Sequence, residues 1–242
     1  YFLEEKGQAV SIVLPSKISN YARTLDVKTI TDKTASEAIA RFGAERKLDQ
    51  WKRPKAIFKK LRQLTRERDQ VVADRTVAKN QLHAELAEAE PGKSSVDRIK
   101  KKISFFDKQE KEIMIELKVV MSVDDELKRM VALICTIPGV GLLTAIIVLA
   151  ETNGFELIRN KRQLVSYAGL DVREKQSGTS VRGKPRISKK GNRFLRKAMH
   201  FPALSAISHD EKYKAIFARL VSKHGIKMKA AVCVQRKMLE RI

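Results

Sequence analysis

Cysteine, histidine and long apolar runs are scarce in this sequence, and each shortage argues against a class of protein. Its two cysteines, Cys135 and Cys233, lie far apart and outside any CxxC pair. We therefore expect reduced thiols in a cytoplasmic protein rather than a disulfide framework. The four histidines show no metal-ligand spacing, which argues against structural zinc. The longest apolar stretch, residues 141–150, is shorter than the roughly 18–20 residues that span a bilayer, so no membrane segment is predicted.

Acidic residues are also few compared with basic ones. The chain has 50 Lys and Arg against 28 Asp and Glu, which gives a formal net charge of +22. Because each cation placed against a phosphate releases condensed counterions, this excess predicts a polyanionic partner. A membrane surface is the alternative anion, and nucleic acid is favoured over it. A hydrophobic fraction of 43% is ordinary for a folded protein and argues against a disordered basic tail.

Residues 1–50 are predicted to be the last part of an α/β domain. Residues 3–6 are typical of a helix end, with Gly7 as its C-terminal cap. Residues 9–14 are predicted to form a short apolar strand that stops at Pro15, and residues 34–42 a further helix. The sequence starts in mid-pattern and ends within a predicted helix, so we expect a fragment of a longer protein.

Residues 51–132 are predicted to form a long antiparallel helical hairpin or coiled coil. Residues 51–90 lack glycine and are rich in helix-forming residues, and Pro91-Gly92 then breaks the helix. In the second helix only Glu110 and Asp124 interrupt an apolar seam with 3-4 spacing. The seam consists of Val96, Ile99, Ile103, Phe106, Ile113, Leu117, Val120, Leu127 and Val131. Packing within one chain and homo-oligomerisation through this arm both remain open.

The first helix of this arm also carries a basic run. Its members are Lys59, Lys60, Arg62, Arg66 and Arg68. Such a run is typical of a solvated helix face, and contact with nucleic acid is the alternative.

Residues 133–242 are predicted to form a helical domain that begins with a glycine turn. Gly139 and Gly141 follow Pro138 and precede a helix that begins near Leu142. This arrangement resembles the helix-hairpin-helix element, in which backbone N–H groups at a helix N-terminus bind a DNA phosphate. A turn between two core helices is the alternative.

A basic loop is the strongest signal in the chain. Between Asp171 and His200 ten cations face only Asp171 and Glu174. The cations are Arg173, Lys175, Arg182, Lys184, Arg186, Lys189, Lys190, Arg193, Arg196 and Lys197. Glycines in the loop allow close approach of the backbone, and hydroxyl side chains lie among the cations. The residues alone favour a phosphate clamp over a serine nucleophile whose transition state is stabilised by the arginines.

Four ordered motifs resemble the C-terminal transposase domain of the insertion-sequence 110 family, which includes the Piv-type invertases. They are Ile137-Pro-Gly-Val-Gly, Tyr167-Ala-Gly-Leu, Ser177-Gly-Thr-Ser-Val-Arg-Gly and Ile187-Ser-Lys-Lys-Gly-Asn-Arg. The resemblance covers residues 133–209 closely, and residues 15–43 and the arm more loosely. It implies a transposase or site-specific recombinase that cuts and rejoins DNA through a phosphoserine at Ser177, with Ser180 and Ser188 as alternatives. It also implies strand exchange, a tetramer and a structured bridge RNA as guide, in a bacterial or archaeal cell.

The same resemblance implies a RuvC-like N-terminal domain whose DEDD acids bind Mg²⁺. Val10-Ser-Ile-Val-Leu-Pro15 is similar to the final strand of that domain, and Asp32 corresponds to the third acid. Asp32 is therefore the expected metal ligand and catalytic acid, although a lone Asp at this position is more often a helix cap. Ala35 stands where the fourth acid is expected, and the first two would precede Tyr1. Carboxylates are the ligands that a hard divalent cation prefers.

The sequence thus predicts a mostly α-helical protein that holds an α/β remnant, a helical arm and a helix-hairpin-helix domain. The expected nucleic-acid-binding residues are Gly139, Gly141, Arg173, Thr179, Ser180, Arg182, Lys184, Arg186, Ser188, Lys189, Lys190, Asn192, Arg193 and Arg196. Two alternatives remain: a non-catalytic nucleic-acid-binding module, and a metal-dependent nuclease of the Holliday-junction type.

Overall fold

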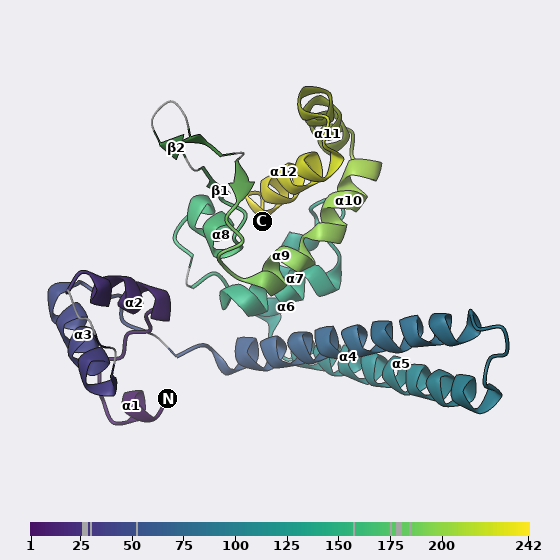
Figure 1. Cartoon of the computed structure of the whole chain (residues 1–242), viewed down its shortest axis with the longest axis horizontal. Helices are drawn as coiled ribbons and strands as arrows, with labels where there is room; N and C mark the ends of the chain where they lie inside the picture. The colour runs from purple at the N-terminus through teal and green to yellow at the C-terminus, as the bar shows by residue number, and fades with distance from the viewer. Residues whose placement is uncertain are drawn as a thin grey trace. The chain divides into compact units, whose positions relative to one another are not determined.

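Helices make up most of the protein, which confirms the predicted mostly α fold class (Figure 1). The computed structural model describes residues 1–25, 29, 31–51, 53–156, 158–174, 176–177, 181–183 and 185–242. Two compact units divide the chain, Tyr1–Pro54 and Lys55–Ile242. None of the described helices combines the length and the hydropathy that a membrane crossing requires.

The first unit contains three helices, α1 (Phe2–Glu5), α2 (Pro15–Arg23) and α3 (Asp32–Glu45). Pro15 begins α2 at a position where its missing N–H is harmless. A capping box formed by Thr31 and Thr34 begins α3. The helices pack through Tyr21 and Phe42, whose ring centroids are 5.2 Å apart in an edge-on arrangement.

The strand predicted at residues 9–14 is not formed. A strand needs a neighbour to satisfy its backbone groups, and no β-ladder includes this segment within the described part of the chain. The segment instead accepts a hydrogen bond at Val10 O from Trp51 N–H, 2.7 Å away. The RuvC-like character of this region therefore stays a prediction.

The second unit begins with two long antiparallel helices, α4 (Ala56–Leu86) and α5 (Lys93–Ser122), which Figure 1 shows side by side. Pro91 and Gly92 separate them as predicted, and Gly92 is the N-cap of α5. Leu61 of α4 and Leu117 of α5 are both fully buried in this region.

Both interruptions of the predicted seam have a structural explanation. Glu110 pairs with Arg68 and Arg75, and Arg75 also contacts Asp107 Oδ1 at 2.6 Å. Asp124 accepts a hydrogen bond from Leu127 N–H at 2.9 Å and caps the next helix, α6 (Asp125–Cys135). Glu110 therefore fits within α5, whereas Asp124 lies at a break between α5 and α6, so the predicted second helix ends at Ser122 and does not continue to Val131.

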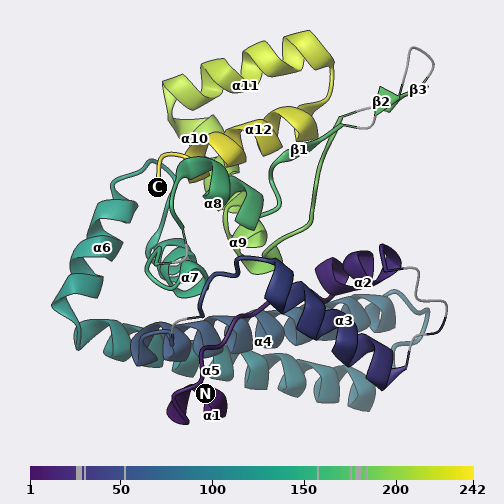
Figure 2. The same cartoon turned by 90° about the vertical axis from the view of Figure 1, so that its left-hand side faces the viewer.

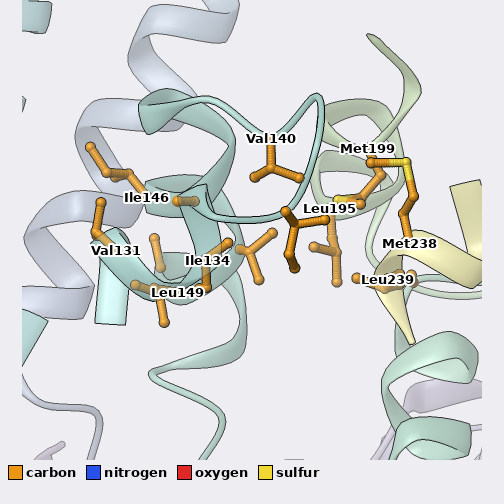
Figure 3. Packing of buried hydrophobic residues seen from close by; sticks show 14 of the residues in the cluster. Val131, Ile134, Val140, Ile146, Leu149, Leu195, Met199, Met238 and Leu239 are labelled. Carbon is orange, nitrogen blue, oxygen red and sulfur yellow. The ribbon is translucent and has the colours of Figure 1, made fainter. Parts of the chain in front are cut away.

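The rest of the second unit holds the helices α7 (Leu142–Thr152), α8 (Lys161–Tyr167), α9 (Arg193–Ala198), α10 (His200–His209), α11 (Glu211–His224) and α12 (Lys227–Leu239). Here α7 packs against α4, α6 and α9, and α12 packs against α8, α10 and α11. Figure 3 shows Ile146 and Leu149 of α7 in an apolar core that also includes Leu195 of α9 and Met238 of α12. All four side chains have no measurable exposure. Burial of this apolar surface holds the α7, α9 and α12 helices together.

Two short antiparallel strand pairs lie between α8 and α9. The inner pair joins β1 (Val172–Arg173) to β4 (Arg186–Ile187), and the outer pair joins β2 (Gln176–Ser177) to β3 (Val181–Arg182). We call the described residues between 172 and 187 the basic hairpin, and its inner strand pair, β1 and β4, the stem. Figure 2 shows it leading away from the helices, with β2 and β3 towards its outer end.

Candidate nucleic-acid interface

The basic hairpin starts from a hydrogen-bonded root formed by residues 167–171 and 188–192. Asn192 N–H donates to Tyr167 O at 2.6 Å, and Lys189 N–H donates to Gly169 O at 3.0 Å. A Cβ atom at Gly191 would collide with the carbonyl oxygen of Tyr167, so glycine permits this close approach. The inner strand pair continues the same ladder outwards, which gives the hairpin a fixed starting direction.

Ser188 is part of this root rather than an open hydroxyl. Its Oγ donates to Asp171 Oδ1 at 2.5 Å, and its backbone N–H donates to Asp171 O at 2.8 Å. The side chain is half-buried. As an alternative nucleophile, Ser188 would first have to give up the bond to Asp171.

A buried carboxylate, Glu151 at the end of α7, joins the root to the arm. It is 1% exposed, and both oxygens accept from Arg66 of α4, from Nε and from Nη2, at 2.9 Å each. Oε2 also accepts from Asn192 Nδ2 at 2.6 Å, and the backbone oxygen accepts from the Tyr167 hydroxyl at 2.9 Å. Hydrogen bonding to Glu151 raises the pKa of the Arg66 guanidinium. The Glu151 carboxylate therefore joins α7 to α4 and to the N-cap of α9, and the backbone oxygen of the same residue binds α8. No sequence motif pointed to Glu151.

Two of the predicted binding residues make contacts inside the protein. The Asn192 side chain bonds Glu151 through Nδ2 and caps α9 through Oδ1, which accepts from Phe194 N–H at 2.9 Å and Leu195 N–H at 3.0 Å. Arg196 Nη1 donates to Ala168 O at 2.7 Å. Contact of either side chain with nucleic acid would compete with these bonds.

The other cations of the region face solvent. Arg173, Arg186, Lys189, Lys190 and Arg193 are all exposed, and none forms an ion pair in the described part of the chain. The Arg193 guanidinium carbon lies 4.8 Å from the centroid of the Phe194 ring. Cations without an acidic partner lose no ion pair when they meet a phosphate, so these five are the ones best suited to bind a polyanion.

Ser177 lies on β2, where its Cα partner is Val181 of β3. Arg182 lies on β3 opposite Gln176. Only the backbone is described at Ser177 and Arg182. Thr179, Ser180 and Lys184 lie outside the described residues, and their binding roles remain predictions.

The glycine turn before α7 divides into a packed position and an open one. Gly139 has φ +83°, and a Cβ there would lie 2.5 Å from Pro202 O and 3.1 Å from Ala206 N of α10. Gly141 is the exposed N-cap of α7, no side chain caps this helix end, and a Cβ would meet nothing within 4 Å. Gly141 therefore remains the candidate for phosphate contact, whereas Gly139 is fixed by packing.

Asp32 does not belong to a metal site in the described structure. It is the exposed first residue of α3, next to the N-cap Thr31, and Ser36 Oγ donates to its backbone oxygen at 2.7 Å. No cluster of three or more His, Cys, Asp or Glu suited to a metal ion occurs among the described residues. The residues present here do not fit a Mg²⁺ site, and Mg²⁺ binding by the intact enzyme remains an expectation.

Comparison with known families identifies the basic hairpin and its supporting helices as parts of a shared domain. A family model described as "Transposase IS116/IS110/IS902 family" matches residues 131–218, and a DEDD-type IS110 model described as "Transposase" matches residues 1–91. The chain belongs to the insertion-sequence 110 family of transposases. Membership makes it a DNA-recombining protein, and the first of these matches spans α7, the basic hairpin and α9.

Curated relatives extend the similarity over nearly the whole transposase chain. The pilin gene-inverting protein of Moraxella bovis is 27% identical over 231 residues, which are 95% of this chain and 70% of the relative. The protein of the same name from Moraxella lacunata is 27% identical over 234 residues, with the same two coverages. An insertion element IS110 uncharacterized 43.6 kDa protein of Streptomyces coelicolor is 33% identical over 84 residues, 35% of this chain and 20% of the relative.

Proposed function

We propose that this transposase cuts and rejoins DNA through a covalent phosphoserine formed by Ser177. The observation that supports this most is the position of Ser177 on β2 of a hairpin whose stem carries exposed, unpaired cations. A nucleophile for phosphorus has to approach a polyanion, and the hairpin that carries Ser177 also carries exposed cations.

The proposed reaction is a transesterification at a DNA phosphate. Ser177 Oγ attacks a DNA phosphorus, the bond from phosphorus to a deoxyribose oxygen breaks, and the serine proton ends on that leaving oxygen. A hydroxyl of another strand then attacks the phosphorus of the phosphoserine. This step joins the two DNA strands and releases the serine, whose oxygen recovers a proton. Arg186, Lys189 and Lys190 stabilise the charge that develops on the phosphoryl oxygens.

The proposal includes further partners of the intact enzyme. Gly141 at the N-terminus of α7 and the exposed hairpin cations hold DNA, and a structured RNA guides the choice of target. An apolar stripe along α5 and its C-cap Val123 supports a homo-oligomer formed through the arm, because Ile115, Val119 and Val123 are 63%, 57% and 81% exposed. These three residues follow helical i, i+4 spacing and so share one face.

A non-catalytic binding module is the second candidate, and the exposed cations favour it equally because phosphate binding needs no nucleophile. A metal-dependent nuclease would rely on the acids of the RuvC-like domain, of which Asp32 corresponds to the third, and no contact of Asp32 among the described residues favours it.

A trapping experiment separates the two candidates. The full-length protein is incubated with DNA carrying the ends of its element and with RNA transcribed from that element, then analysed on a denaturing gel for a protein–DNA adduct. We expect Ser177→Ala to abolish the adduct and leave DNA affinity within about 2-fold, since a nucleophile contributes to chemistry rather than ground-state binding. Ser188→Ala tests the alternative nucleophile: it still forms the adduct, although loss of its bond to Asp171 in the root slows the reaction. An adduct that survives in Ser177→Ala overturns the proposal, and DNA binding with no adduct in any version supports the binding module.

A further inference from the structure

The proposed chemistry leaves Glu151 without a role, although its place in the fold is unusual. It follows a run of apolar residues in α7, including Ile146, Val148 and Leu149, and it is as completely buried as they are. A buried carboxylate is unfavourable unless ion pairs and hydrogen bonds compensate it. The groups that bind this carboxylate are therefore held firmly in position, because losing any of their bonds would leave buried charge uncompensated.

On one side the constraint reaches the arm. Arg66 of α4 binds both carboxylate oxygens with two donors at 2.9 Å, a fork geometry that fixes orientation as well as distance. One turn earlier on α4, Arg62 Nε donates to Ala150 O at 2.9 Å. The end of α7 is thus fastened to α4 by two arginines spaced one helical turn apart.

On the other side the constraint reaches both flanks of the hairpin root. Asn192 belongs to the returning flank and donates to the Glu151 carboxylate at 2.6 Å. Tyr167 belongs to the outgoing flank, and its hydroxyl donates to the backbone oxygen of Glu151 at 2.9 Å. The two flanks are also joined to each other, because Asn192 N–H donates to Tyr167 O. The Phe194 ring, two residues after Asn192, lies 4.6 Å from the guanidinium carbon of Arg66, which adds a second contact between the root and the arm.

We infer that Glu151 is a positioning residue that fixes the root of the basic hairpin to the arm helix α4 and so sets the position of Ser177. The inference rests on the proposed role of Ser177. Figure 2 shows that the hairpin leaves the helices at this root, between β1 and the start of α9. A small rotation at the root is therefore carried outwards to β2. A displacement of about 1 Å between reacting groups can lower a rate by about 10²-fold.

Glu151→Gln tests the inference with little change in volume. The carboxylate accepts three hydrogen bonds, two from Arg66 and one from Asn192. Gln offers one acceptor oxygen and an NH2 donor, so it cannot accept all three and turns a donor towards another donor. We expect the rate of adduct formation at saturating DNA to fall by about 10²-fold. The half-saturating DNA concentration changes by less than about 2-fold, because the hairpin cations remain. Arg66→Lys keeps the charge but removes the fork, and we expect a smaller loss of about 10-fold.

The matched control is Glu240→Gln, which removes a carboxylate bound by Arg236 Nε at 3.0 Å within α12. We expect it to leave the rate unchanged. Amide hydrogen exchange gives a readout independent of activity: Lys189 and Asn192, whose N–H groups close the root, exchange faster in Glu151→Gln, whereas α12 keeps its protection.

The outcomes separate the inference from the proposed function. A loosened root with an unchanged rate at saturating DNA, in both Glu151→Gln and Arg66→Lys, overturns the inference alone. If Glu151→Gln also loses protection in α12, the substitution has loosened the whole domain. The rate of adduct formation by Arg66→Lys then decides whether the inference holds. A wild-type protein that forms no adduct overturns the proposed function, and with it the inference that depends on it.

Discussion

The basic hairpin and the segment that follows it, residues 188–196, both carry cations and polar side chains, yet these side chains make different contacts. In the following segment, Asn192 and Arg196 donate to Glu151 and Ala168 inside the protein. On the stem, Arg173 and Arg186 are exposed and have no acidic partner among the described residues. A basic, glycine-rich motif is therefore not uniformly a binding surface. Asn192 and Arg196 stabilise the base of the hairpin, whereas Arg173 and Arg186 on the hairpin are exposed to solvent.

The glycine turn before α7 shows the same contrast, and substitutions there are expected to change the free energy of unfolding most. Gly139→Ala places a Cβ 2.5 Å from Pro202 O at a φ of +83°, so we expect a loss of about 3 kcal/mol in the free energy of unfolding. Gly141→Ala meets no atom within 4 Å, and we expect a loss below about 1 kcal/mol. Urea denaturation measures both. Equal losses at the two glycines would contradict the division between a packed and an open position.

A smaller loss of stability is expected at the root. Asn192→Ala removes the cap of α9 and one donor to a buried carboxylate, which together amount to about 2 kcal/mol. Asn192→Ser restores a capping oxygen without reaching Glu151 and recovers about 1 kcal/mol of this. Thermal unfolding of both variants gives the comparison. If Asn192→Ala unfolds like wild type but loses DNA affinity, the residue belongs to the binding surface instead.

The smallest change in stability is expected on the stem. Arg186→Ala alters the free energy of unfolding by no more than about 0.5 kcal/mol, because the side chain is exposed and unpaired in the described structure. Binding to DNA weakens, and the slope of log K against log salt decreases by about one. Fluorescence anisotropy titrations between low and moderate salt measure the slope. A slope equal to that of wild type would remove Arg186 from the phosphate contacts.

Local signals in the sequence were sufficient for much of the fold. The break at Pro91-Gly92 and the 3-4 seam predicted the two long helices, and the helix expected at residues 34–42 lies within α3. These features depend on residues close to one another along the chain. The strand expected at residues 9–14 failed because strand formation depends on a partner, which an apolar run does not specify.

The site was predicted less completely because its key contacts join distant residues. The basic run that contains Arg66 is typical of a solvated helix face. The local sequence pattern around Arg66 gives no sign of its partner Glu151, which lies 85 residues further along the chain. The available signal was Glu151 itself, a lone acid after 21 residues without any charge, residues 130–150. In the same way, the capping role of Asn192 follows from the helix that begins one residue later, whereas its bond to Glu151 does not.

Locating the DNA-linked residue by peptide mass spectrometry tests the central claim most directly. Trypsin cleavage after Lys175 and Arg182 releases Ser177 in the peptide of residues 176–182, whereas Ser188 falls in residues 187–189. We predict a phosphodiester-linked nucleotide on the first peptide, with fragmentation that assigns it to Ser177 rather than to Ser180. A nucleotide on Ser188, or on neither peptide in a preparation that recombines DNA, would contradict the account.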